Sequence, residues 1–192
     1  MKIKVLKFGG TSVGSVEAIK RSANIICDWS KKSKVIVVLS AMSGETDRLI
    51  NLTKSFSKSP NPVDFDNAIS TGENLSCALM SIYLNNQKTK SKSLHSWQIP
   101  IMTSSEHMKS RILSINKRFL LNELENLDVL VVPGFQGIND NNRITTIGRG
   151  GSDASAIMLA KFFKAQRCII YTDVEGVYTT CLLYTSDAAD EE

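Results

Sequence analysis

Residues 4–13 read KVLKFGGTSV, a short apolar run, charged only at Lys4 and Lys7, that stops at two glycines and continues through hydroxyl residues into a helical pattern. The run predicts a strand over residues 3–8, with Lys7 at its end. Glycine lets backbone amides approach an anion closely, and the start of the following helix adds positive potential. The stretch therefore predicts a phosphate site in a strand–turn–helix unit, although a tight turn with an exposed lysine fits the same string. Neither the Walker P-loop nor the G-x-G-x-x-G fingerprint occurs.

Strand-like and helix-like segments alternate along the rest of the chain, which is typical of an α/β domain with a mainly parallel sheet. Apolar runs predict further strands at residues 35–39, 99–102, 129–132 and 168–171. Helical patterns begin at Ser15, Asp47, Asn74, Asn116 and Ser152. Residues 57–62 are typical of a surface linker, and residues 88–92 of a polar, exposed turn.

Composition limits the classes of function. The chain has 192 residues, 42% of them hydrophobic, which is enough for one domain with a core. No apolar run approaches the roughly 18 residues of a membrane span, and the first strand leaves no room for a signal peptide. We therefore expect a cytoplasmic protein without a membrane partner. The basic residues are scattered singly, so nucleic acid is not an expected partner, and no metal-ligand spacing predicts a metal site.

Charge is distributed unevenly along the chain. The last twelve residues carry four acidic and no basic side chains, so the rest has 23 basic and 15 acidic residues, a net charge of +8. A body with this charge suits small anionic substrates.

A second glycine-rich string, TTIGRGGSD, covers residues 145–153 and leads into a predicted helix. Arg149 can clamp a carboxylate through two parallel hydrogen bonds. The amides of residues 150–152 can form an anion-binding nest beside the helix start. A flexible glycine loop with a helix cap is the competing interpretation, and it leaves the arginine without a role.

Polar residues also follow two buried strands. The string SAMSGET begins at Ser40, and a Pro-Gly turn follows Val132. Because ligands bind outside the carboxyl ends of parallel strands, Lys7, Ser40 and the second turn are predicted to face one cleft. Simple capping of the next helix is the alternative.

Two further strings carry weaker signals. In STGE, residues 70–73, the carboxylate of Glu73 could accept an ammonium group, but an isolated glutamate is usually a solvated surface charge. The string TDVEGVY, residues 172–178, fits contacts to adenine and ribose or an ordinary exit from a strand.

Six strings occur here in one order and together closely resemble the catalytic domain of the aspartokinases, within the amino acid kinase family. They are KFGGTSV, LSAMSGET, STGE, PGFQG, TTIGRGGSD and YTDVEGVY. The resemblance covers residues 4–180 and implies the amino acid kinase fold, a mainly parallel central sheet flanked by helices in three α/β/α layers. Acetylglutamate- and uridylate-type kinases share that fold but differ at these strings.

The resemblance implies phosphoryl transfer from ATP, as its Mg²⁺ complex, to the β-carboxylate of L-aspartate. The product, 4-phospho-L-aspartate, is the first intermediate of lysine, threonine and methionine biosynthesis. The full-length relatives are expected to be homo-oligomers. Two alternatives stay open, namely another kinase of this fold and a non-catalytic nucleotide-binding or regulatory module.

The resemblance also assigns residues to roles. Lys7 would stabilise the transferred phosphoryl group, and Asp153 would orient Lys7. Arg149 would bind the α-carboxylate of aspartate, and Glu73 its α-ammonium. The implied nucleotide-binding residues are Lys7, Phe8, Gly9, Gly10, Thr172, Asp173 and Tyr178. The implied aspartate-binding residues are Ser40, Thr46, Glu73, Phe135, Arg149, Gly150, Gly151 and Ser152.

The resemblance stops near Thr180. Residues 1–180 are expected to be a partial amino acid kinase domain, incomplete at its C-terminal side and without the ACT regulatory domains. Residues 181–192, CLLYTSDAADEE, are expected to be a non-native tail, since codons typical of a transposase sequencing adapter would encode their beginning. A genuine divergent C-terminus is the alternative. Such a fragment is expected to have weak activity or none.

Overall fold

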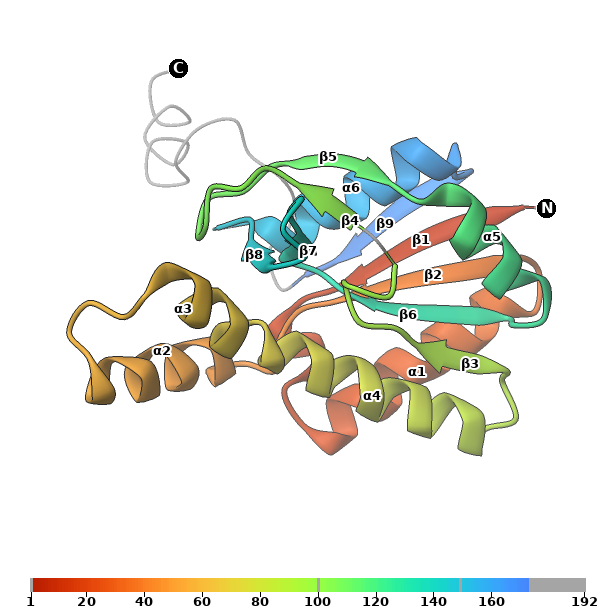
Figure 1. Cartoon of the computed structure of the whole chain (residues 1–192). Coiled ribbons are helices and arrows are strands. Elements are labelled where there is room, and N and C mark those ends of the chain that lie inside the picture. The colour runs from red at the N-terminus through yellow and green to blue at the C-terminus, as the bar shows by residue number, and fades with distance from the viewer. Residues whose placement is uncertain (1, 100, 149, 173–192) are drawn as a thin grey trace, which may run out of the picture.

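The computed structural model describes residues 2–99, 101–148 and 150–172 (Figure 1). Five of the described strands form one sheet in the order β3-β6-β2-β1-β9, and every pairing in it is parallel. These strands are β1 (Ile3–Phe8), β2 (Lys34–Leu39), β3 (Ser91–Ser93), β6 (Val129–Pro133) and β9 (Arg167–Tyr171). The expected mainly parallel α/β architecture is confirmed.

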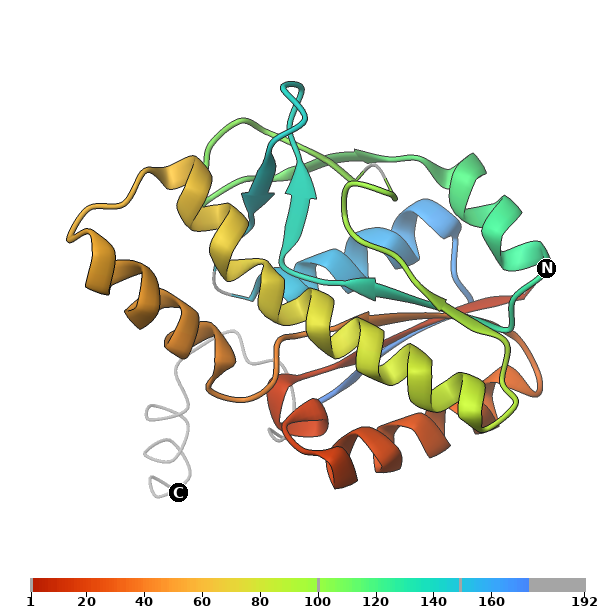
Figure 2. The ribbon, with the colours of Figure 1, turned by 60° about the horizontal axis from the view of Figure 1, so that its bottom comes forward.

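Helices cover both faces of this sheet (Figures 1 and 2). One face packs against α1 (Val16–Ser30) and α4 (Thr71–Asn86), with Leu6, Val37 and Met80 in the shared core. The opposite face packs against α5 (Lys117–Glu125) and α6 (Gly151–Phe163), with Val5, Leu120 and Leu159 in its core. The short helix η1 (Gly10–Val13) links β1 to α1.

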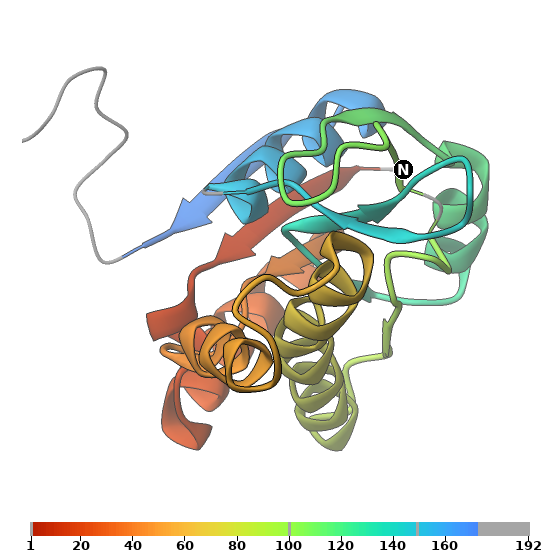
Figure 3. The same ribbon diagram turned by 60° about the vertical axis from the view of Figure 1, so that its left-hand side comes forward.

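A smaller sheet lies beside α5 and α6, in the order β5-β4-β7-β8. Its strands are β4 (Ile101–Thr103), β5 (Ile112–Ile115), β7 (Gln136–Ile138) and β8 (Ile144–Thr146). Helices α2 (Glu45–Phe56) and α3 (Pro62–Ile69) form a pair that projects from the carboxyl ends of the central strands, as Figure 3 shows. Within the described residues, no helix is long and apolar enough to cross a bilayer.

Several predicted boundaries were wrong. Helix α2 begins at Glu45 rather than Asp47, because Gly44 takes the left-handed conformation just before it. Helix α6 begins at Gly151, and its N-cap is Gly150, not Ser152. The polar segment 88–92 is not all exposed turn, since β3 begins at Ser91 and pairs with β6. The sequence pattern also missed α3. It missed most of the smaller sheet as well, because strands of three or four residues show too little periodicity. The expected tail, residues 181–192, lies outside the described residues.

Candidate active site

Strand alternation decides where Lys7 points. Successive side chains of a strand face opposite sides of the sheet. Leu6 and Phe8 therefore enter the core under α1, while Val5 and Lys7 face α6. The Lys7 ammonium lies 2.7 Å from Oδ1 of Asp153, in the first turn of α6, and Lys7 is only 8% exposed. A buried positive charge is thus held at the carboxyl end of β1.

The N-terminus of α6 packs closely against the end of β6. A Cβ atom added to Gly134 would lie 2.7 Å from the Cβ of Ser152, so only glycine fits there. The hydroxyl of Ser155 donates to the carbonyl of Gly151 and accepts from the amide of Phe135. The first N–H groups of a helix have no acceptor within the helix, and they attract anions. The close packing brings this anion-attracting end to the same edge of the sheet as Lys7.

The turns after β1 and β2 form another wall at this edge. The amide of Ser43 donates to the carbonyl of Gly10 over 3.2 Å. A Cβ atom on Gly10 would come within 3.0 Å of the Ala41 carbonyl oxygen, so the absence of a side chain permits this approach. Gly9 lies beside the Lys7 ammonium, which would be 3.5 Å from a Cβ at that position. The two turns thus place small residues and backbone groups around the lysine.

Glu73 is buried, with 3% exposure, which corrects the general expectation of a solvated surface charge. Its Oε1 accepts a hydrogen bond from the amide of Ala41, at 3.1 Å. Its Oε2 is also buried, and no described residue makes a hydrogen bond to it. Burial raises the pKa of Glu73 to about 7, because the charged form loses its hydration. A buried carboxylate with a free oxygen is ready to accept a cationic ligand.

One pocket of about 880 Å³ joins these features. It lies at the carboxyl ends of the central strands, between α2, α3, α4 and the start of α6. The predicted site residues that line it are Lys7, Gly10, Ser40, Thr46, Glu73, Phe135, Gly150, Gly151, Ser152 and Asp153. The predicted shared cleft is confirmed as geometry, whereas the ligand roles of these residues stay predictions.

Other predicted residues lie elsewhere. Phe8 and Thr172 line a separate hollow of about 370 Å³, together with residues of η1 and α1. Phe8 stacks on Tyr171 there, with the ring centroids 4.5 Å apart. Arg149, Asp173 and Tyr178 fall outside the described residues. The structure therefore brings together most of the residues of the predicted aspartate site. Of the residues predicted to contact the nucleoside, it places only Phe8 and Thr172.

Several lining residues were missed by sequence reasoning. They are Phe65 and Ile69 of α3, and Met108 and Lys109 of the segment between β4 and β5. The latter segment is irregular, so periodicity carried no signal for it. The backbone of Met108 has a positive φ of 65°, as does that of Phe135 with 68°. Residues with this strained backbone cluster at functional sites, but the strain is not readable from the sequence.

The sequence matches the amino acid kinase family over residues 2–181. The chain belongs to this family. This member is 44% identical over 98% of its length to an aspartokinase of Geobacillus stearothermophilus, and covers 46% of that protein. It is 46% identical over 94% of its length to an aspartate kinase of Pseudomonas fluorescens, covering 44% of it. The chain thus spans slightly less than half the length of these curated relatives.

Solved structures agree with this membership. Aspartokinase III of E. coli, in complex with aspartate and ADP, superimposes with a TM-score of 0.80 at 26% identity, covering 93% of this chain and 51% of that one. The aspartate kinase of Synechocystis gives a TM-score of 0.75 at 40% identity, covering 93% of this chain and 29% of that one. This amino acid kinase family member therefore has the fold of the aspartokinase catalytic domain.

Proposed function

We propose that this family member carries the aspartate- and phosphate-binding part of an aspartate kinase. The observation that carries the proposal is a single pocket lined by a buried ammonium, that of Lys7, and by a buried carboxylate, that of Glu73. One oxygen of this carboxylate has no hydrogen-bond partner among the described residues. An amino acid has an ammonium that suits Glu73, and a phosphoryl group carries negative charge that suits Lys7. The similarity to aspartokinases supports aspartate as that amino acid.

On the aspartate side, Glu73 would accept the α-ammonium through Oε2. Bound cation would favour the charged form of Glu73 and lower its pKa from the raised value. Arg149 is proposed to bind the α-carboxylate, as the motif implies. Further contacts to aspartate are proposed for six residues that all line the pocket, namely Ser40, Thr46, Phe135, Gly150, Gly151 and Ser152.

On the nucleotide side, Lys7 and the turn at Gly9 and Gly10 would hold the phosphates of ATP. Phe8, Thr172, Asp173 and Tyr178 are proposed to contact the nucleoside. Mg²⁺ would arrive bound to the phosphates, which is its usual mode in kinases. In the part of the chain that the structure describes, no group of three or more His, Cys, Asp or Glu side chains is placed to hold a metal ion.

The chemistry requires little beyond positioning and charge. One oxygen of the β-carboxylate of aspartate attacks the γ-phosphorus of ATP. The bond from that phosphorus to the β–γ bridging oxygen breaks, and ADP leaves. The carboxylate has a reference pKa near ~3.9, so it is ionised at neutral pH and needs no general base. Lys7 would stabilise the negative charge on the transferred group, with Asp153 holding its ammonium in place.

The boundaries of the domain are part of the proposal. We propose that residues 1–180 are a partial kinase domain, and the chain spans slightly less than half the length of the curated relatives. Residues 181–192 are proposed to be a tail foreign to the family. Full-length relatives with their regulatory domains are proposed to be homo-oligomers. The nucleotides that encode Cys181 onward decide the origin of the tail, and codons unlike an adapter would contradict it.

The function is tested by binding and turnover on this chain. Calorimetry measures the affinity for aspartate, N-acetylglutamate and uridylate, and hydroxylamine traps any aspartyl phosphate formed with MgATP. The expected result is binding of aspartate in preference to the other two, with slow hydroxamate formation. Preference for N-acetylglutamate or uridylate would identify another kinase of this fold. Binding of ATP with no affinity for any acceptor would indicate a nucleotide-binding module.

A further inference from the structure

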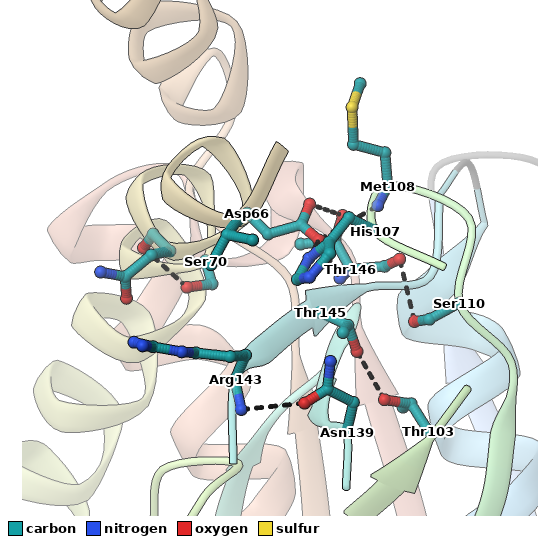
Figure 4. Close-up of polar contacts among 12 residues, drawn as sticks. Asp66, Ser70, Thr103, His107, Met108, Ser110, Asn139, Arg143, Thr145 and Thr146 are labelled. Carbon is teal, nitrogen blue, oxygen red and sulfur yellow. Dashed lines mark hydrogen bonds and ion pairs between the residues drawn. The ribbon is translucent and has the colours of Figure 1, made fainter. Parts of the chain in front are cut away.

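Asp66 is a buried carboxylate that lies outside the pocket lining and joins three separate segments of the chain. It belongs to α3 and is 0% exposed. Its Oδ2 lies 2.8 Å from Nδ1 of His107, 3.0 Å from the amide of Met108 and 3.1 Å from the amide of Thr146. Its Oδ1 accepts from the hydroxyl of Thr146 at 2.6 Å. Figure 4 shows these groups converging on the one carboxyl group.

The partners of Asp66 belong to the wall of the pocket. Met108 and Thr146 both line it, and Lys109 continues the same wall. The two segments also contact each other directly, since the amide and hydroxyl of Ser110 donate to the carbonyl of Thr146. A Cβ atom on Gly148 would lie 3.3 Å from the carbonyl oxygen of Met108. Asp66 thus holds this wall from behind, without reaching the pocket itself.

The backbone of Met108 needs such support. Its φ of 65° is a left-handed conformation. For any residue other than glycine this conformation is unfavourable in free energy, and it persists only where surrounding contacts impose it. The amide of Met108 points at Asp66, so the carboxylate is one of the contacts that impose it. Hydrogen bonds to a charged acceptor are roughly twice as strong as those between neutral groups.

We propose that Asp66 is a positioning residue for the acceptor side of the pocket. It fixes the wall formed by Met108, Lys109 and Thr146, and through Thr146 it fixes the start of the loop that leads to Gly150 and α6. Loss of the carboxylate would therefore weaken aspartate binding more than ATP binding, because Lys7 and its turn lie apart from this network. That aspartate is the ligand of this wall rests on the proposed function. That Asp66 holds the wall in place rests on the hydrogen bonds alone.

The first test needs no ligand. In Asp66→Ala, the amides of Met108 and Thr146 lose their acceptor, so their hydrogen exchange should become at least about tenfold faster than in the unmodified chain. The amide of Ala41, which donates to Glu73, serves as an internal reference and should be unchanged. Asp64→Ala is the matched control, since Asp64 is an exposed carboxylate on the same helix. Unchanged exchange at Met108 and Thr146 would overturn the proposal.

The second test separates positioning from general destabilisation. For Asp66→Ala, the dissociation constant for aspartate should rise about tenfold, while that for ATP stays within about twofold, both by calorimetry. Asp66→Asn keeps an acceptor for the amides and should recover most of the lost affinity. Equal weakening of both ligands, or no weakening of aspartate binding, would contradict a positioning role. If the unmodified chain binds no aspartate, the proposed function fails, and the exchange result alone decides whether Asp66 holds the wall.

If Asp66→Ala does not unfold cooperatively in urea, that variant is not properly folded, and a milder variant is tested instead. His107→Ala removes one donor at the edge of the network and leaves the other three bonds to Asp66. Exchange at Met108 should be faster, and aspartate affinity should fall about threefold. An unchanged aspartate affinity together with unchanged exchange at Met108 would overturn the proposal in that case.

Discussion

The ammonium of Lys7 and the carboxylate of Asp153 form an ion pair of 2.7 Å between the end of β1 and the first turn of α6. The lysine is nearly buried, whereas the side chain of Asp153 is 43% exposed. Because the carboxylate is partly exposed, water screens the pair and reduces its contribution to stability. The pair is therefore better suited to orient the lysine toward the pocket than to hold the fold together.

Lys7→Ala tests the phosphate assignment. The variant should lower the rate of ATP-dependent hydroxamate formation at least about 100-fold, because a preorganised charge at the transferred group is lost. Its dissociation constant for ATP should also rise about tenfold. Lys2→Ala is the control, since Lys2 is an exposed lysine next to the same strand. Near-normal rate and ATP affinity in Lys7→Ala would remove the assignment.

Asp153→Asn tests whether the carboxylate orients Lys7. We expect a loss of about 10–100-fold in hydroxamate rate and a change in the free energy of unfolding of less than about 1 kcal/mol. Asp28→Asn, which breaks the exposed ion pair with Lys31, provides the comparison and should leave the rate unchanged. A large loss of stability without a loss of rate would assign Asp153 to the fold instead.

Glu73 predicts a dependence of stability on pH. Its pKa is about 7 in the folded chain against 4.5 for an ordinary glutamate, so the folded state holds the proton more tightly. Its favourable contribution is complete below about pH 4.5 and is lost as the pH rises through about 7. Between pH 5 and pH 8, wild type should lose up to about 3 kcal/mol of unfolding free energy relative to Glu73→Gln.

Urea denaturation at several pH values measures that difference. Glu125→Gln, at an exposed glutamate, is the control and should show no comparable trend. Glu73→Gln should also bind aspartate more weakly at pH 8, because it cannot offer a negative charge to the ammonium. Parallel stability curves for wild type and Glu73→Gln would contradict the raised pKa.

Gly72→Ala tests the close packing that presents Glu73. Alanine favours a helix over glycine by about 1 kcal/mol, but here its Cβ would lie 2.9 Å from the Cβ of Ala41. We expect a net destabilisation of about 1–3 kcal/mol in urea denaturation, as for other overpacked sites. The double variant Gly72→Ala with Ala41→Gly removes the clash and should recover most of the loss. Additive losses in the double variant would show that crowding against Ala41 is not the cause.

The predictable part of the fold is the part with long patterns. The strands β1, β2 and β6 follow mainly apolar runs, interrupted in β1 only by Lys4 and Lys7. The hydroxyl of Ser15 accepts a hydrogen bond from the amide of Ala18, as an N-cap should. The strands of the smaller sheet are three or four residues long, and their pairing depends on partners far away in the chain. No local pattern could reveal them.

The site divides in the same way. Lys7, Ser40 and the turn after β6 could be assigned to one cleft because the ends of parallel strands meet at one edge. The burial of Glu73 could not be assigned, because it depends on α4 packing against the turn at Ala41. Asp66 gave no signal at all, since its role arises from three segments that meet only in the folded chain.

The sequence by itself determined the parallel sheet, the glycine turns and the lysine at the end of β1, because apolar periodicity and glycine are local properties of the chain. Only the tertiary structure decided that Lys7 pairs with Asp153, that Oε2 of Glu73 is buried without a hydrogen bond from any described residue, and that Asp66 accepts from the amide of Met108. Those features depend on burial and on distances between remote segments, which arise when the chain packs.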